Sequence, residues 1–220
     1  MKFLKRLINR VSRTIQIMIL AGWHVNKYQN LRTWGASSYT SPSPHFIKHA
    51  CILRNGLKGS TYIETGTYMG DTTALLSRVA ERVISIEPEP RLYQLARSRF
   101  KNSENIEIMN GASEELFPIL IPKLRGDISF WLDGHYSAGV TFQGVQDTPI
   151  IQELSEISKN LINLGQVVVM VDDIRCFDPT IEGFEDYPTR SYLVNWAKQN
   201  KFWWTIEHDI FIAKNQIAEN

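Results

Sequence analysis

Short apolar runs alternate with stretches of helical spacing along the chain from residue 60 onward. The apolar runs predict strands at 62–64, 82–87, 105–109, 128–133 and 166–171, the last of them unbroken, as in buried parallel strands. Apolar residues at helical spacing predict helices at 72–80, 88–99, 114–120, 148–161 and 192–199. Two final runs, 202–208 and 210–213, predict a closing hairpin. This alternation predicts an α/β fold with a doubly wound, mostly parallel seven-stranded sheet, whose ligands lie beyond the carboxyl ends of the strands.

The first 45 residues do not follow this alternation. Residues 1–25 carry apolar side chains at helical spacing with basic residues mostly on the other side, which predicts an amphipathic N-terminal helix. Its uncharged part, 14–23, is too short to span a bilayer. Residues 26–45 are rich in turn formers toward their end and predict a connector. The expected organisation is therefore an extension, 1–45, and a domain, 46–220, that starts with a helix at 46–57.

Charge is unevenly distributed, although the net charge of the chain is only +1. Residues 1–63 contain ten Lys and Arg and no Asp or Glu. Such a basic segment suits an anionic partner, and one interpretation places residues 1–25 on an anionic membrane surface. The alternative is a helix that packs on the domain or on a second copy in a homo-oligomer.

The cysteine content bears on the compartment. The chain has two cysteines, Cys51 and Cys176, which suggests a reducing compartment and buried apolar roles for both. The expected location is cytoplasmic, with peripheral attachment at the inner membrane face if the membrane interpretation of residues 1–25 holds.

A glycine loop follows the first predicted strand. It reads Glu64-x-Gly66-x-x-x-Gly70, without the lysine of a phosphate-binding P-loop or the spacing of a dinucleotide fingerprint. A carboxylate before the first glycine would repel a pyrophosphate but suits a cationic ligand, such as the amino group of S-adenosylmethionine. Glu87 ends the next strand, 23 residues after Glu64, where an acid can accept hydrogen bonds from both ribose hydroxyls.

These features resemble the cofactor half of the class I S-adenosylmethionine-dependent methyltransferases, whose sheet is Rossmann-like. The resemblance implies a set of cofactor-binding residues: Glu64, Gly66, Tyr68, Gly70, Glu87, Ser113 and Asp133. In that family the loop after the third strand covers the adenine edge, which makes Ala112 and Ser113 candidate contacts. Ser113 has an alternative role as the N-cap of the helix at 114–120.

Three acids follow the fourth and fifth predicted strands: Asp133, Asp172 and Asp173. Adjacent parallel strands end roughly 5 Å apart, so these carboxylates should be neighbours and should repel one another unless a cation joins them. Oxygen-rich sites of this kind suit Mg²⁺. On its own, the pair Asp172-Asp173 fits a solvated turn as well, whereas Asp133 and the glycine loop favour the metal site. The histidines at 45 and 49 have no third ligand near in sequence, which favours solvated or substrate-facing side chains.

The acids also resemble those of the metal-dependent O-methyltransferases of the macrocin and catechol types. In these families a metal-binding Asp follows the fourth strand and an Asp pair or Asp-Asn follows the fifth, which matches Asp133, Asp172 and Asp173. The macrocin type has its catalytic base, an Asp, two residues after the first Asp; this chain departs from that pattern and has His135 there, whose side chain can do the same work near neutral pH. The resemblance thus implies His135 as the base, with Tyr136 as a second candidate.

The expected function is a Mg²⁺-assisted, S-adenosylmethionine-dependent O-methyltransferase. The expected acceptor is a hydroxylated small molecule or glycan, and nucleic acid is not expected because no aromatic–basic module for bases is evident. Two alternatives stay open: a scaffold that has kept the cofactor fold and lost catalysis, and an enzyme that works without metal.

Overall fold

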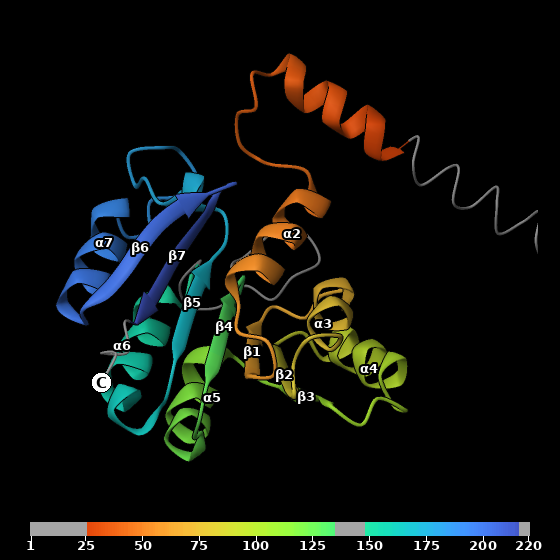
Figure 1. The fold of residues 1–220 in the computed structure, drawn as a ribbon, viewed down its shortest axis with the longest axis vertical. Coiled ribbons are helices and arrows are strands. Elements are labelled where there is room, and N and C mark those ends of the chain that lie inside the picture. The colour runs from red at the N-terminus through yellow and green to blue at the C-terminus, as the bar shows by residue number, and fades with distance from the viewer. Residues whose placement is uncertain (1–25, 135–147, 216–220) are drawn as a thin grey trace, which may run out of the picture.

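Seven strands form a single sheet in the computed structural model, which describes residues 26–134 and 148–215 (Figure 1). The strands are β1 Thr61–Thr65, β2 Arg82–Glu87, β3 Ile106–Asn110, β4 Ile128–Leu132, β5 Val167–Val171, β6 Phe202–Glu207 and β7 Ile210–Asn215. Their order is β3-β2-β1-β4-β5-β7-β6. Strands β1 to β5 are parallel, and β7 is antiparallel to both β5 and β6. The predicted seven-stranded, mostly parallel sheet and its closing hairpin are confirmed.

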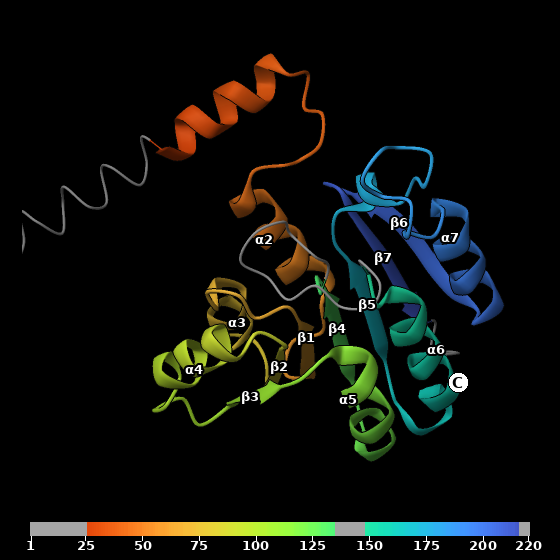
Figure 2. The same ribbon diagram turned by 180° about the vertical axis from the view of Figure 1, so that it is seen from behind.

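Helices cover both faces of this sheet (Figures 1 and 2). Their bounds are α2 His45–Asn55, α3 Asp71–Leu76, α4 Pro90–Arg99, α5 Ser113–Leu120, α6 Ile150–Asn160 and α7 Arg190–Gln199. Side chains of α5, α6 and α7 pack in one core cluster, and side chains of α2 and α3 pack in the other. Helix α4 lies beside α3 at the β3 end of the sheet (Figure 1). The doubly wound arrangement is therefore confirmed.

Strand β5 shows why an unbroken apolar run is required at the centre of the sheet. Val167, Val169 and Val171 belong to the core cluster of α5, α6 and α7. Val168 and Met170 belong to the cluster of α2 and α3. Because successive side chains point to opposite faces and both faces are covered, every position of the strand must be apolar.

The segment predicted as a connector is partly helical. Residues 26–36 form a helix, drawn in red-orange in Figure 1, that stands away from the sheet. Its Trp34 indole donates to the carbonyl of Thr40 (2.8 Å), and the ring lies 5.9 Å from that of His208. The connector prediction is wrong for this part because the turn formers begin only at Gly35. The amphipathic helix predicted at 1–25 lies outside the described residues. No helix in the described ranges is long and apolar enough to cross a bilayer.

The two cysteines are both buried and both free, as expected for small apolar residues. Burial raises the pKa of the Cys176 thiol to about 11, so this thiol is protonated at neutral pH.

Candidate functional site

The loop between β1 and α3 has an unusual backbone, because Gly66, Tyr68 and Gly70 all have positive φ (+84°, +48° and +79°). A Cβ on Gly66 would lie 2.6 Å from the carbonyl oxygen of Asp133, so the approach of β4 requires a glycine there. A Cβ on Gly70 would lie 2.7 Å from the Phe100 ring, so this glycine serves packing against the end of α4. Tyr68 is half exposed on the outside of the loop.

Glu87 is fixed beneath this loop by backbone donors. Its Oε2 accepts from the N–H of Tyr68 (2.7 Å) and its Oε1 from the N–H of Glu89 (2.9 Å). The Asn110 amide donates to the carbonyl of Glu87 (2.8 Å), which joins the ends of β2 and β3. A carboxylate has about four acceptor positions, so two remain for the hydroxyls of a ligand. Burial raises the pKa of Glu87, and the two backbone hydrogen bonds oppose that rise.

Glu64 is fully buried on the face of the sheet that α3 covers. Its Oε2 accepts from the hydroxyls of Thr73 and Ser85, both at 2.5 Å. Thr73 lies in the first turn of α3, so this helix supplies one of the two donors to the Glu64 carboxylate. Burial raises the pKa of Glu64 to about 7, and the hydroxyl donors only partly offset it. Oxygen Oε1 has no hydrogen-bond partner within the described part of the chain.

The remaining predicted cofactor residues are Ser113 and Asp133. Helix α5 begins at Ser113, and Ala112 occupies the N-cap position, so the alternative capping role of Ser113 is not observed. Ser113 is buried at the carboxyl edge of β3. The N–H of Asp133 donates to the carbonyl of Thr65 (3.2 Å), and its own carbonyl packs on Gly66. The structure thus brings Asp133 to the glycine loop.

The loop residues fit an S-adenosylmethionine-like ligand. Among the described residues, Glu87 accepts only two hydrogen bonds and so keeps acceptor positions for hydroxyls, and one buried carboxylate oxygen of Glu64 has no donor. A buried polar atom without a partner is costly and is often a place where a ligand completes the hydrogen bonding. Cofactor binding by this set of residues remains a prediction.

A lysine lies between the two acids that follow β5. Lys48 of α2 places its Nζ 2.6 Å from Asp172 Oδ1 and 2.5 Å from Asp173 Oδ1. Burial alone would lower the pKa of Lys48, but the charges of Asp172 and Asp173 and their hydrogen bonds outweigh it and hold that pKa above its ordinary value. Lys48 is therefore charged at neutral pH.

Arg175 and Asp209 extend this group. The Arg175 guanidinium pairs with the carboxylates of Asp173 and Asp209, and Asp209 Oδ2 lies 3.9 Å from Lys48 Nζ. We call the five side chains the acid–base cluster: Lys48, Asp172, Asp173, Arg175 and Asp209. It contains three carboxylates and two cations.

This arrangement does not fit the divalent metal expected at Asp133, Asp172 and Asp173. The repulsion between Asp172 and Asp173 is relieved by the Lys48 ammonium, which occupies the space between them. The described ranges contain no group of three or more His, Cys, Asp or Glu side chains that could hold a metal ion. The His45 and His49 rings meet edge-on with their centroids 4.2 Å apart, and burial lowers the pKa of His49 to about 4. His135 and Tyr136, the candidate bases, lie outside the described residues.

Sequence reasoning missed Lys48 as a member of the site. The signal that could have found it is its position in α2, where Lys48, Cys51, Ile52 and Asn55 form the buried face. A lysine at helical spacing with buried residues needs an acidic partner, because an unpaired buried charge is costly.

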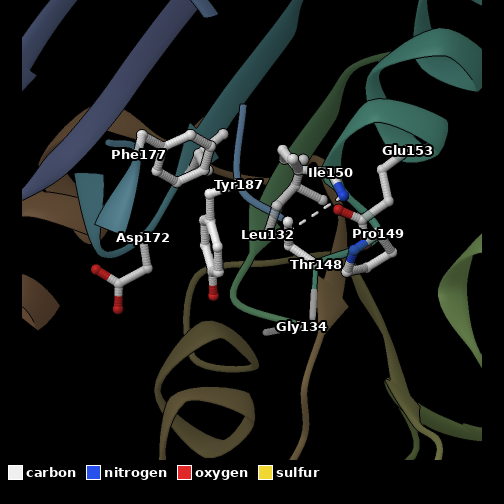
Figure 3. A pocket seen from close by; sticks show the side chains of 10 residues that line it. Leu132, Gly134, Thr148, Pro149, Ile150, Glu153, Asp172, Phe177 and Tyr187 are labelled. Carbon is white, nitrogen blue, oxygen red and sulfur yellow. Dashed lines mark hydrogen bonds between the residues drawn. The ribbon is translucent and has the colours of Figure 1, made fainter. Parts of the chain in front are cut away.

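A small cavity of about 10 Å³ lies beside the acid–base cluster, with room for about one water molecule (Figure 3). Asp172 and Tyr187 line one part of it, and Thr148 and Glu153 line another. The Asp172 carboxylate and the Tyr187 side chain point the same way in Figure 3. The Phe177 ring packs edge-on against Tyr187 at 5.4 Å.

Comparison with known proteins supports the fold. No family model matches the chain. Over 51 residues it is 41% identical to the probable ribosomal RNA small subunit methyltransferase A of Methanosarcina mazei, which is 23% of this chain and 19% of that relative. A putative caffeoyl-CoA O-methyltransferase from Staphylococcus aureus superposes with a TM-score of 0.53 at 15% identity, covering 88% of this chain and 96% of its own. The 23S rRNA methyltransferase ErmE gives a TM-score of 0.50 at 15% identity, covering 82% and 71%.

One prediction is corrected by these comparisons. Nucleic acid was excluded as a partner and a small-molecule or glycan acceptor was expected, yet the sequence match is to a protein named as an RNA methyltransferase. The exclusion relied on the absence of an aromatic–basic module, but nucleic acids are also held by dispersed phosphate contacts that leave no such motif. The sheet order, the glycine loop and the structural likeness together show that the chain has the Rossmann-like fold of S-adenosylmethionine-dependent methyltransferases.

Proposed function

We propose that the chain is an S-adenosylmethionine-dependent methyltransferase. The observation that carries this proposal is the pair of buried acids around the left-handed loop: within the described part of the chain, Glu87 keeps acceptor positions and one oxygen of Glu64 has no donor. When bound, the cofactor supplies a methyl group on a sulfonium centre. Glu87 accepts hydrogen bonds from the ribose, and Glu64 provides negative charge for the amino group. Gly66 has no side chain, so the cofactor can approach the backbone closely.

The acceptor enters at the carboxyl edge of β4 and β5 in this proposal. Asp133 and Asp172 follow these paired strands, and the small cavity lined by Asp172 and Tyr187 lies beside this edge. The two carboxylates make this edge of the sheet polar, and the Phe177 and Tyr187 rings form an apolar wall of the cavity. RNA is the acceptor class to test first, because the 51-residue match is to an RNA methyltransferase.

Replacing Glu87 with glutamine should weaken S-adenosylmethionine binding roughly 10- to 100-fold, as expected when a hydrogen bond to a charged group worth about 1.5–3 kcal/mol is lost. The amide has one oxygen, so its NH₂ would face the N–H of Tyr68 or of Glu89. Isothermal titration calorimetry with S-adenosylmethionine and S-adenosylhomocysteine measures the effect.

Glu107→Gln is the matched control, because Glu107 is an exposed acid on β3 that pairs with Arg82. It should bind the cofactor like the unchanged protein. Equal affinities of the two variants would contradict the proposed role of Glu87. Transfer of labelled methyl groups to small-subunit ribosomal RNA transcripts then separates an enzyme from a scaffold: binding without transfer to RNA or to any other acceptor pool favours the scaffold.

A further inference from the structure

We propose that Lys48 is a built-in cation that takes the place of a divalent metal at Asp172 and Asp173, so that this edge of the sheet works without metal. This inference deepens the proposed function, and what it implies for catalysis rests on the chain being a methyltransferase. The occupancy of the site by Lys48 is a separate matter that can be measured without cofactor or acceptor.

The first step is steric. The Lys48 ammonium lies 2.6 Å and 2.5 Å from one oxygen of each acid. A Mg²⁺ ion bound to the same two oxygens would need to lie about 2.0–2.1 Å from them. Both positions fall in the same small volume between the carboxylates, so the ammonium and the ion exclude each other.

The second step is electrostatic. In the acid–base cluster, the charges of three carboxylates are opposed by Lys48 and Arg175, which leaves a net charge of −1. Asp173 is shared by both cations, and Asp209 pairs with Arg175. Most of the attraction that would draw a divalent ion is therefore already satisfied by the chain itself.

The third step is that Lys48 cannot easily leave. Its side chain is 9% exposed and lies on the buried face of α2 together with Cys51 and Ile52. The acids are equally fixed: the N–H of Asp173 donates to Asp172 Oδ1 (2.8 Å), and Asp173 has a left-handed backbone with φ of +53°. The ammonium thereby holds the Asp172 carboxylate in place at the cavity it shares with Tyr187.

The test is a titration with Mn²⁺ in which binding is measured by calorimetry and by electron paramagnetic resonance. The unchanged protein should bind no Mn²⁺ at millimolar concentration, and its Tm should not change with Mn²⁺ or with a chelator. Lys48→Ala should have a lower Tm, should gain a Mn²⁺ site, and should recover part of the lost Tm when Mn²⁺ is added. Lys58→Ala, at an exposed lysine near α2, should behave like the unchanged protein.

Two results would overturn the inference. One is Mn²⁺ binding by the unchanged protein that Asp172→Asn abolishes, because the site would then accept metal beside Lys48. The other is a folded Lys48→Ala that gains no Mn²⁺ site. If Lys48→Ala fails to fold, Lys48→Gln replaces it. The titration of the unchanged protein still shows whether the site accepts metal beside Lys48. None of these measurements uses the cofactor, so they stand if methyl transfer is not found.

Discussion

Replacing Gly66 with alanine is expected to destabilise the protein by about 2–5 kcal/mol and to abolish cofactor binding. Two costs add: about 1–2 kcal/mol for a side chain in the left-handed region, where Gly66 has φ of +84°, and about 1–3 kcal/mol for overpacking. The clash is with the carbonyl oxygen of Asp133, a backbone atom that cannot rotate away, so the loop or the end of β4 must shift. Urea unfolding measures the stability.

Gly126→Ala is the matched control for this prediction. Gly126 has φ of +77°, yet a Cβ there would meet nothing within 4 Å, so this variant shows the backbone cost alone, about 1–2 kcal/mol. The difference between the two variants isolates the contact with Asp133. If both lose the same stability, the close approach of β4 to the loop is not what requires glycine at position 66.

Glu64→Gln is expected to stabilise the protein at pH 8 by up to about 3 kcal/mol and to weaken cofactor binding. The folded-state pKa of Glu64 is about 7, above its ordinary value of 4.5, because the side chain is fully buried. Between pH 4.5 and 7 the folded state keeps a proton that the unfolded state has lost, so stability falls as pH rises, and above pH 7 the loss is complete. Glutamine carries no charge and removes this loss.

Urea unfolding at pH 5, 6, 7 and 8 tests this sign. The difference between Glu64→Gln and the unchanged protein should be small at pH 5 and should grow up to pH 8. Glu115→Gln, at an exposed position of α5, is the matched control for the removal of one carboxylate. Calorimetry at pH 8 should show weaker S-adenosylmethionine binding by Glu64→Gln, since the amide offers no charge to the amino group. A constant difference across the pH range would mean that Glu64 does not carry the raised pKa.

The sheet could be predicted because its strands are buried on both faces. β2 has the predicted bounds, and in β5 the apolar run follows from the two core clusters on either side. The helix at 26–36 could not be predicted in the same way, because it lies apart from the sheet and its apolar residues, such as Tyr28, stay largely exposed. Without a buried face, helical spacing leaves only a weak pattern.

The glycine loop and its acids were accessible to sequence reasoning because they are contiguous or follow strands at regular distances. The partner of Asp172 was not, since Lys48 precedes it by 124 residues and the contact forms only when α2 packs on the sheet. The positions of the strand ends predicted that the acids are neighbours. The repulsion between their charges requires a cation, but it does not determine which cation lies between them. A metal ion and a lysine satisfy the same requirement.

The position of β7 bears on how the protein is made. Of the described strands this one comes last in the sequence, yet it lies between β5 and β6, and Asp209 immediately before it pairs with Arg175. While the chain emerges from the ribosome, β5 therefore keeps an open edge, and the ion pairs around Lys48 stay incomplete, until Ile210–Asn215 has been synthesised. The nascent protein completes the edge that carries its proposed chemistry only after the rest of the sheet exists.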